Sequence, residues 1–244
     1  MINETATRSN DIMKTCVVTG ANSGIGKAVA GRLTEKGYKV YCIGGPGGFE
    51  DNEAGENVVR LSLDFRKESD IKKVAEAVKE DSLDLLVNAA GTAFYGVAES
   101  IRPCDIAAMA DVNVKAPLVI TSMLMPKIRK AKGAVINVSS VTAETYANPH
   151  GAAYGATKAA LTSFGRSLFE EVRKHGVRVI NVHPDLTDTN LYRNADFTVT
   201  GEPDSTLFAE DVAGQIEFVL GAREGSCVTD ITVRPQKNRI VKKS

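Results

Sequence analysis

Tyr154 and Lys158 carry the chemistry that the sequence offers most directly. The two residues are four positions apart in Ala153-Tyr-Gly-Ala-Thr-Lys158, so on a helix their side chains share one face. A free phenol has a pKa of about 10, too high for a base at neutral pH, and a nearby ammonium favours the phenolate. The pair therefore predicts a proton-transfer unit beside a reacting group.

A glycine-rich turn near the N-terminus points to a nucleotide as the neighbour of that pair. It runs Thr19-Gly20-Ala-Asn-Ser-Gly24-Ile-Gly26, directly after an apolar run and before a helical pattern. Glycines in that setting let the backbone approach a pyrophosphate, whose charge is stabilised by N–H groups at the helix start. A turn that only packs a helix on a strand is the alternative. A P-loop is excluded, because Ala21 and Ala28 stand where its first glycine and its magnesium-binding Ser or Thr belong.

The elements that position these groups follow from periodicity, since short β-branched runs alternate with longer helical patterns. Strands are expected at 14–19, 39–43, 57–61, 83–87, 134–138, 177–182 and 228–233, and helices near 24–36, 68–80, 104–130, 153–174 and 208–220. Strands that are apolar on both faces and separated by helices predict an α/β fold. We expect a Rossmann-like doubly wound sheet of about seven parallel strands with helices on both faces.

Composition narrows the class of protein further. The 244 residues carry 30 Lys+Arg against 30 Asp+Glu, which disfavours a nucleic-acid partner. The chain shows no run of 18 apolar residues and no secretory signal, so we expect no membrane partner and a cytoplasmic location. The four cysteines and three histidines match no metal-ligand spacing, so no metal site is expected. Residues 1–12 form a polar leader, and 13–244 are expected to be one domain.

The motifs between Lys14 and Pro235 together resemble the short-chain dehydrogenase/reductase family. The landmarks are Thr19-Gly20-x-x-x-Gly24-x-Gly26, Asp64 after the third strand, Asn88-Ala-Ala-Gly91, Asn113, Ser140 and Tyr154-x-x-x-Lys158. The resemblance implies that Tyr154 exchanges a proton with the substrate oxygen, and that Lys158 lowers the pKa of the tyrosine and holds the nicotinamide ribose. By the same resemblance Ser140 orients the carbonyl and Asn113 supports a proton-relay water.

The resemblance also implies a dinucleotide site. Its residues would be Gly20, Ser23, Gly24, Ile25, Gly26, Gly44, Asp64, Asn88, Gly91, Tyr154, Lys158, Pro184, Thr187 and Thr189. Three landmarks have plainer alternatives: Ser140 as a strand-end cap, Asn113 as a partner of the helix backbone, and Asp64 as the cap of the following helix. Ser139 is the less favoured catalytic serine, because it lies further from Tyr154.

The sequence departs from the family pattern at four places. Ala89 replaces the second asparagine of NNAG, Ser140 and Tyr154 are 14 positions apart, which is one more than usual, and Asp185 follows Pro184 in place of glycine. The second strand ends in Gly44-Gly45-Pro46-Gly47-Gly48, without an acid for the ribose hydroxyls or an arginine for a 2′-phosphate. Small residues leave room for that phosphate and their N–H groups can form a nest, so NADP is favoured over NAD.

The substrate side has fewer markers. Candidates for an apolar pocket, each equally well explained by core packing, are Phe94, Tyr95, Tyr146 and His150. The loop 185–207 is too long for a simple connection, so it is a substrate lid or a disordered insertion. A lid is favoured by its apolar residues Leu186, Leu191, Tyr192 and Phe197. The tail from Lys237 to Ser244 is expected to be a solvated end.

These observations lead to an NAD(P)-dependent oxidoreductase that transfers hydride between nicotinamide and a ketone or secondary alcohol, its small-molecule substrate. The alternative is a catalytically silent dinucleotide-binding sensor or scaffold of the same fold, which the intact Ser-Tyr-Lys set disfavours. The stretch from Val228 to Pro235 resembles a subgroup active on hydroxy acids and hydroxy amino acids. Family members commonly pair the helices that correspond to 104–130 and 153–174, which implies a homotetramer or homodimer.

Overall fold

A parallel sheet forms the centre of the computed structural model, which describes residues 13–49, 55–144 and 149–243. Its strands follow the order β3-β2-β1-β4-β5-β6-β8, and every neighbouring pair is parallel. They are β1 (Thr15–Thr19), β2 (Lys39–Gly44), β3 (Val58–Ser62), β4 (Leu85–Asn88), β5 (Ala134–Val138), β6 (Arg178–Pro184) and β8 (Asp230–Val233). The strand order reverses between β1 and β4, where such sheets bind ligands. The predicted doubly wound sheet is confirmed, whereas the predicted leader 1–12 lies outside the described residues.

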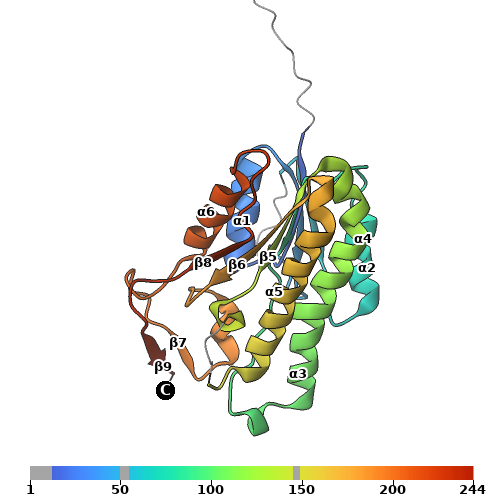
Figure 1. The fold of residues 1–244 in the computed structure, drawn as a ribbon. Coiled ribbons are helices and arrows are strands. Elements are labelled where there is room, and N and C mark those ends of the chain that lie inside the picture. The colour runs from blue at the N-terminus through green and yellow to red at the C-terminus, as the bar shows by residue number, and fades with distance from the viewer. Residues whose placement is uncertain (1–12, 50–54, 145–148, 244) are drawn as a thin grey trace, which may run out of the picture.

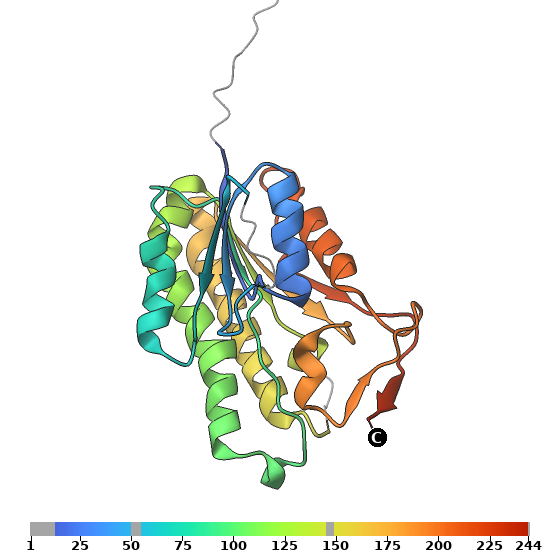
Figure 2. The same ribbon diagram turned by 180° about the vertical axis from the view of Figure 1, so that it is seen from behind.

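Helices cover both faces of the sheet (Figures 1 and 2). On one face lie α1 (Gly24–Glu35) and α6 (Ala209–Leu220), which pack against each other. On the other face lie α2 (Glu68–Ala77), α4 (Ala116–Ala131) and α5 (Ala152–Val172). Two apolar cores result, because residues such as Val18 of β1 bury their side chains under α1 and α6, while the alternate Val17 faces the other layer.

A long, nearly continuous helical stretch is formed by α3 (Pro103–Ala110), a π-helical turn (Asp111–Lys115) and α4. By length and composition, Pro103–Ala131 would be long and apolar enough to cross a membrane. In this fold its residues Ile120, Leu124 and Ile128 are almost fully buried in the core beneath the sheet. The apolar face of this stretch is therefore a packing face of the α/β fold. The remaining short helical turns are η1 (Ala98–Ser100), η3 (Val141–Ala143), η4 (Arg173–His175) and η5 (Asn190–Asn194).

A second, two-stranded sheet joins the segment 185–207 to the C-terminal tail. β7 (Phe197–Val199) pairs antiparallel with β9 (Ile240–Lys242) near the C-terminus. The Lys243 ammonium also donates a hydrogen bond of 2.6 Å to the Tyr192 carbonyl. The predicted solvent exposure of the tail holds for the described residues, which are all exposed from 237 to 243. The sequence did not predict that the tail also forms a strand, which satisfies the backbone groups that β7 would otherwise leave unpaired at an edge. Residues 185–207 are ordered rather than a disordered insertion, and their two ends meet through the Leu207 N–H and the Leu186 carbonyl at 2.8 Å.

A row of polar side chains crosses four adjacent strands under α5. Asn88, Asn137, Asn181 and Asp230 are partners in neighbouring strands. Each amide donates to the next residue of the row, over 3.0, 3.2 and 3.4 Å, and the row ends on the Asp230 carboxylate. Helix α5 passes directly over it at Gly165, where a Cβ would lie 2.1 Å from the Asn181 Oδ1. We call this row the amide ladder.

Candidate active site

A cavity of about 1200 Å³ opens at the carboxyl ends of the strands. It is lined by all of the predicted cofactor residues except Asn88, namely Gly20, Ser23, Gly24, Ile25, Gly26, Gly44, Asp64, Gly91, Tyr154, Lys158, Pro184, Thr187 and Thr189. Ser140 lines it as well. The volume exceeds that of an ordinary small-ligand pocket, so it can hold a dinucleotide together with a small substrate.

The glycine turn between β1 and α1 forms one wall of the cavity. Gly20 and Gly24 have φ of +70° and +50°, a backbone region that other residues rarely adopt. A Cβ on Gly26 would lie 2.3 Å from the Gly20 carbonyl oxygen. Helix α1 starts at Gly24 with no acidic residue in its first turn, so its N–H groups face the cavity without a competing carboxylate. This cradle fits the pyrophosphate of a dinucleotide.

The turn after β2 differs from its prediction. A Cβ on Gly44 would lie 2.9 Å from Cβ of Asn22 and 3.0 Å from the Phe49 ring, so the free space is beside Gly45, where nothing lies within 4 Å. The Gly45 N–H already donates to the Asn22 side chain at 3.3 Å, and the Gly48 N–H donates to the Gly45 carbonyl. The expected N–H nest is therefore wrong for these two donors, because the turn uses them itself.

Asp64 lines the cavity after β3, as the dinucleotide-site prediction expects. Its carboxylate receives two hydrogen bonds of 2.8 Å from the guanidinium of Arg66, which holds the pKa of Asp64 below its usual range. Asp64 does not cap the next helix, since Lys67 occupies the N-cap position of α2. Both Asp64 and Arg66 line the cavity, so this wall presents a paired acid and base.

Tyr154 and Ser140 meet at the centre of the cavity. Burial raises the pKa of Tyr154, the charge of Tyr192 raises it further, and a hydrogen bond with Ser140 lowers it. The Ser140 hydroxyl accepts hydrogen bonds from the Thr142 N–H at 3.2 Å and from the Thr142 hydroxyl at 3.0 Å. Because both acceptor positions of Ser140 are occupied, its own hydrogen is left to donate towards the phenol or a substrate oxygen.

Lys158 lies one helical turn after Tyr154 and is 4% exposed. Its ammonium donates to the Val138 carbonyl at 2.8 Å and lies 5.8 Å from the centre of the Tyr154 ring. Burial lowers the pKa of Lys158 to about 8. By contrast, Ser139 turns away from the cavity centre, since its hydroxyl bonds the Lys158 carbonyl at 3.0 Å and the Thr162 hydroxyl at 2.7 Å.

Two predicted residues do not line the cavity. The Asn88 amide belongs to the amide ladder and also donates to the Thr121 hydroxyl at 3.1 Å, so the prediction that Asn88 contacts cofactor is not supported by its position. Asn113 is fully buried in the π-helical turn, and its amide bonds both backbone groups of Thr92 and the Thr157 hydroxyl. Its side chain therefore ties the central helix to the loop after β4, and does not bond its own helix backbone.

Aromatic side chains enclose the part of the cavity beside Tyr154. Tyr95 lies 5.6 Å from Tyr154, 6.1 Å from Tyr192 and 5.1 Å from Phe197, measured between ring centroids. Phe94, His150, Leu186 and Leu191 also line the cavity, whereas the predicted Tyr146 lies outside the described residues. The sequence interpretation missed lining residues from the lid and tail, namely Arg193, Asp196, Arg234, Asn238, Ile240 and Lys242. In the sequence of the tail, only the adjacent β-branched residues Ile240 and Val241 indicate a strand.

Comparison with known proteins decides the family. Residues 14–198 match the model of the short chain dehydrogenase family. The chain belongs to this family. Serine 3-dehydrogenase of Agrobacterium fabrum is 36% identical over 242 residues, spanning 91% of this chain and 93% of that protein. An uncharacterized oxidoreductase of Staphylococcus epidermidis is 30% identical over 91% of this chain and 97% of its own length.

Solved structures agree with this membership. A metagenomic short-chain oxidoreductase in complex with NADP has a TM-score of 0.74 and 28% identity, over 91% of this chain and 97% of that one. An archaeal alcohol dehydrogenase from Thermococcus sibiricus has a TM-score of 0.80 at 20% identity, covering 93% and 99% of the two chains, and shows the shared fold. This short-chain dehydrogenase is accordingly an NAD(P)-dependent oxidoreductase, as the sequence predicted.

Proposed function

We propose that this short-chain dehydrogenase interconverts a ketone and a secondary alcohol at Tyr154, with Ser140 and Lys158 as its partners. The observation that carries the proposal is the hydrogen-bond state of Ser140, whose two acceptor positions are filled by Thr142. Its remaining hydrogen can serve only as a donor, which is what a carbonyl oxygen or a phenolate needs. The glycine cradle, Asp64 and Gly91 would hold the dinucleotide, which supplies the hydride when bound.

The protein's own part in the reaction is proton transfer and orientation. In reduction, Tyr154 donates its phenol proton to the substrate oxygen as that oxygen gains charge, and in oxidation the phenolate takes the alcohol proton. Ser140 donates a hydrogen bond to the same oxygen and fixes its position. The protonated Lys158 stabilises the phenolate, since its ammonium lies beside the ring and is screened from water.

In this proposal the Asn113 side chain has a structural role. Both hydrogens of its amide are used, by the Thr92 carbonyl and the Thr157 hydroxyl, and its oxygen accepts from the Thr92 N–H. The side chain's own contribution is to hold the π-helical turn against the loop that carries Gly91.

The lining of the cavity and the relatives both support a proposal for the substrate class. The rings of Tyr95, Tyr192 and Phe197 favour a compact substrate with an apolar part, while Arg193 and Lys242 add cationic groups to the lining. The similarity to a serine 3-dehydrogenase supports including hydroxy acids among the candidates. We propose a small hydroxy acid or secondary alcohol.

The cofactor in this proposal is NADP, with NAD as the alternative. No acid stands at Gly44 or Gly45 to repel a 2′-phosphate, and the space beside Gly45 is open. The NADP complex of the metagenomic relative supports the same preference.

The test is an activity panel read by the absorbance of reduced nicotinamide. Neutral secondary alcohols, 3-hydroxy acids and the matching ketones are assayed with NADP(H) and NAD(H). We expect Tyr154→Phe to keep cofactor binding and to lower turnover by at least about 100-fold. Near-normal turnover of this variant would remove Tyr154 from the mechanism, and binding without turnover across the panel would favour the sensor alternative. A preference for NADH beyond about tenfold would reject NADP.

The proposal also covers the domain organisation, the oligomeric state and the location of the protein. Residues 13–244 act as one domain in which 185–207 closes over the substrate. The protein forms a homodimer or homotetramer through the helices at 103–131 and 152–172, whose exposed Ile106 and Met123 remain without a partner in the described part of the single chain. It works in the cytoplasm, without nucleic-acid or membrane partners.

A further inference from the structure

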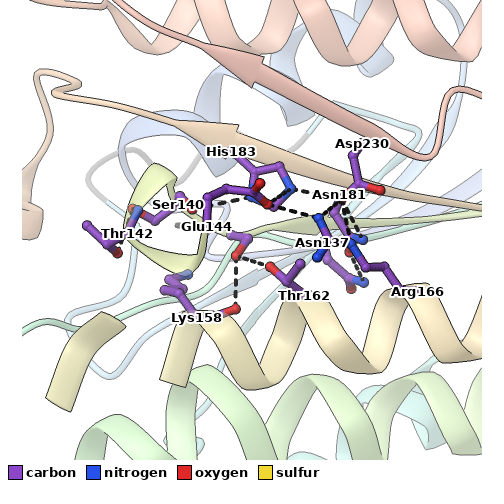
Figure 3. A network of polar contacts seen from close by, with 11 residues as sticks. Asn137, Ser140, Thr142, Glu144, Lys158, Thr162, Arg166, Asn181, His183 and Asp230 are labelled. Carbon is purple, nitrogen blue, oxygen red and sulfur yellow. Dashed lines mark hydrogen bonds and ion pairs between the residues drawn. The ribbon is translucent and has the colours of Figure 1, made fainter. Parts of the chain in front are cut away.

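A buried histidine lies directly behind the proposed catalytic serine. His183 of β6 is 0% exposed and does not line the cavity. Its Nδ1 lies 3.3 Å from the Ser140 carbonyl oxygen, and its Nε2 lies 3.0 Å from Oδ1 of Asp230 (Figure 3). The imidazole thus connects the backbone of the serine to the carboxylate at the end of the amide ladder.

The same group of side chains also holds the other end of the serine turn. Glu144 follows η3 and places its Oε1 3.4 Å from the His183 Nε2. Arg166 of α5 bonds Glu144 at 2.9 Å and Asp230 at 3.0 Å. Both ends of the segment 140–144 are therefore fixed to one cluster, which we call the serine clamp: Glu144, Arg166, His183 and Asp230.

The chemistry of these contacts restricts the role of the cluster. The Ser140 carbonyl and the two carboxylates can only accept hydrogen bonds, so each of them needs a donor from the cluster. Glu144, His183 and Asp230 also have ligand atoms within 4.8 Å of one another, as a metal site would. Both carboxylates already bind Arg166, so its guanidinium takes the place that a metal ion would have. The cluster therefore holds the turn.

The orientation of Ser140 depends on that turn. Its hydroxyl is fixed by two hydrogen bonds from Thr142, which lies in the middle of the clamped segment. The hydrogen bond between Ser140 and Tyr154 lowers the pKa of the tyrosine. A shift of the turn therefore changes both the position of the Ser140 donor and the acidity of Tyr154.

We propose that His183 is a positioning residue for Ser140, which it holds through the backbone carbonyl while Asp230 fixes the ring. This inference rests on the proposed roles of Ser140 and Tyr154. It assigns no contact between His183 and substrate or cofactor.

Two near-isosteric variants separate the two contacts of the ring. The amide nitrogen of Asn matches Nδ1 of histidine, and that of Gln matches Nε2. His183→Asn can keep the bond to the Ser140 carbonyl, whereas His183→Gln can keep only the bond to Asp230. We expect His183→Gln to lower kcat by at least about tenfold with an unchanged Kd for NADPH, and His183→Asn to retain more activity. Equal loss in both variants would overturn the proposal.

The pH profile and a double-mutant cycle test whether His183 positions Ser140 or has only a structural role. Besides Ser140, the described residues place Lys158 of its own helix, and Tyr95 and Tyr192 from the opposite wall, near the Tyr154 ring. In His183→Gln, as in Ser140→Ala, the pH of half-maximal alcohol oxidation should rise by about half a unit or more, because Tyr154 loses the same hydrogen bond. The double variant should be no slower than Ser140→Ala alone.

The outcomes of the cycle distinguish the two proposals. Full activity in Ser140→Ala would reject the proposed function itself. An impaired Ser140→Ala combined with additive losses and an unmoved pH profile in His183→Gln would reject only the clamp. If the His183 variants do not fold, Glu144→Gln tests the other end of the clamp at a partly exposed position, with the same upward pH shift expected at about threefold lower kcat. An unchanged profile in that variant would again count against the clamp.

Discussion

The cavity has two walls that are built in different ways. The cofactor wall (Gly20–Gly26, Gly44 and Gly91) is built from closely packed glycine backbone. A Cβ on Gly20 or Gly26 would lie within 3.0 Å of backbone atoms, and one on Gly24 or Gly44 would lie 2.9 Å from a neighbouring side chain. The substrate wall (Tyr95, Tyr192, Phe197 and β9) consists of side chains and of a strand whose three residues are all exposed. A backbone wall tolerates almost no change, whereas a side-chain wall can vary without altering the sheet. The two walls should therefore respond differently to substitution.

The largest expected effect lies where the two walls meet, at Lys158. Its ammonium is 3.6 Å from the position of a Cβ on Gly91 and also adjoins Tyr154. Lys158→Met should lower turnover by at least about 100-fold and weaken cofactor binding. At pH 7 it should also raise the free energy of unfolding by about 2 kcal/mol, because the buried charge costs about 3 kcal/mol and its hydrogen bond to Val138 returns about 1.

The pH dependence of that stability difference has a definite sign. The pKa of Lys158 is about 8 in the fold and 10.5 in the unfolded chain, so the unfolded state binds more protons between these values. The penalty is complete below pH 8 and fades as the pH approaches 10.5. Buried groups such as Cys16 and Tyr154, whose pKa values are raised, destabilise both proteins at alkaline pH, so the difference between wild type and Lys158→Met is the quantity to measure. A constant difference from pH 7 to 10 would contradict this account.

A medium effect is expected from one methyl group on the cofactor wall. Gly26→Ala places a Cβ 2.3 Å from the Gly20 carbonyl oxygen, so the turn must shift. We expect a loss of about 1–3 kcal/mol in stability and at least about tenfold weaker NADPH binding. Gly31→Ala, in the same helix with nothing within 4 Å, is the matched control and should gain about 0.5–1 kcal/mol. Equal behaviour of the two variants in thermal melts and titrations would refute a backbone-defined wall.

The smallest effect is expected on the substrate wall. Truncation after Pro235 removes β9 and the Lys243 contact to Tyr192, so β7 loses its partner. We expect KM for the carbonyl substrate to rise about tenfold while the Kd for NADPH stays within about twofold. Val241→Pro should act in the same direction, and Val241→Thr should not. A truncation that weakens cofactor binding as strongly as substrate binding would mean that the two walls are not independent.

The sequence predicted the cofactor wall better than the substrate wall for physical reasons. Gly20, Gly24 and Gly26 have a fixed spacing because each meets a local backbone requirement, and local requirements are visible along the chain. The tail strand Ile240–Lys242 is too short for periodicity, and its partner β7 is distant in sequence. The family resemblance assigns Asn88 to the cofactor, and only the strand register shows that its amide meets Asn137 instead. The use of the Gly45 N–H by Asn22 is equally invisible without the fold.

The amide ladder has a consequence for how the sheet assembles. Parallel strands that are apolar on both faces could slip along one another at little cost, because every shifted alignment still buries hydrocarbon. A slip of β5 or β6 by one residue would turn Asn137 or Asn181 to the opposite face and leave its amide buried in an apolar layer without a partner. In the observed alignment the row fits under α5 because residue 165 is glycine, since a Cβ there would lie 2.1 Å from the Asn181 Oδ1. The three asparagines and Asp230 thus fix the register of the strand that leads to Ser140 and of the strand that contains His183.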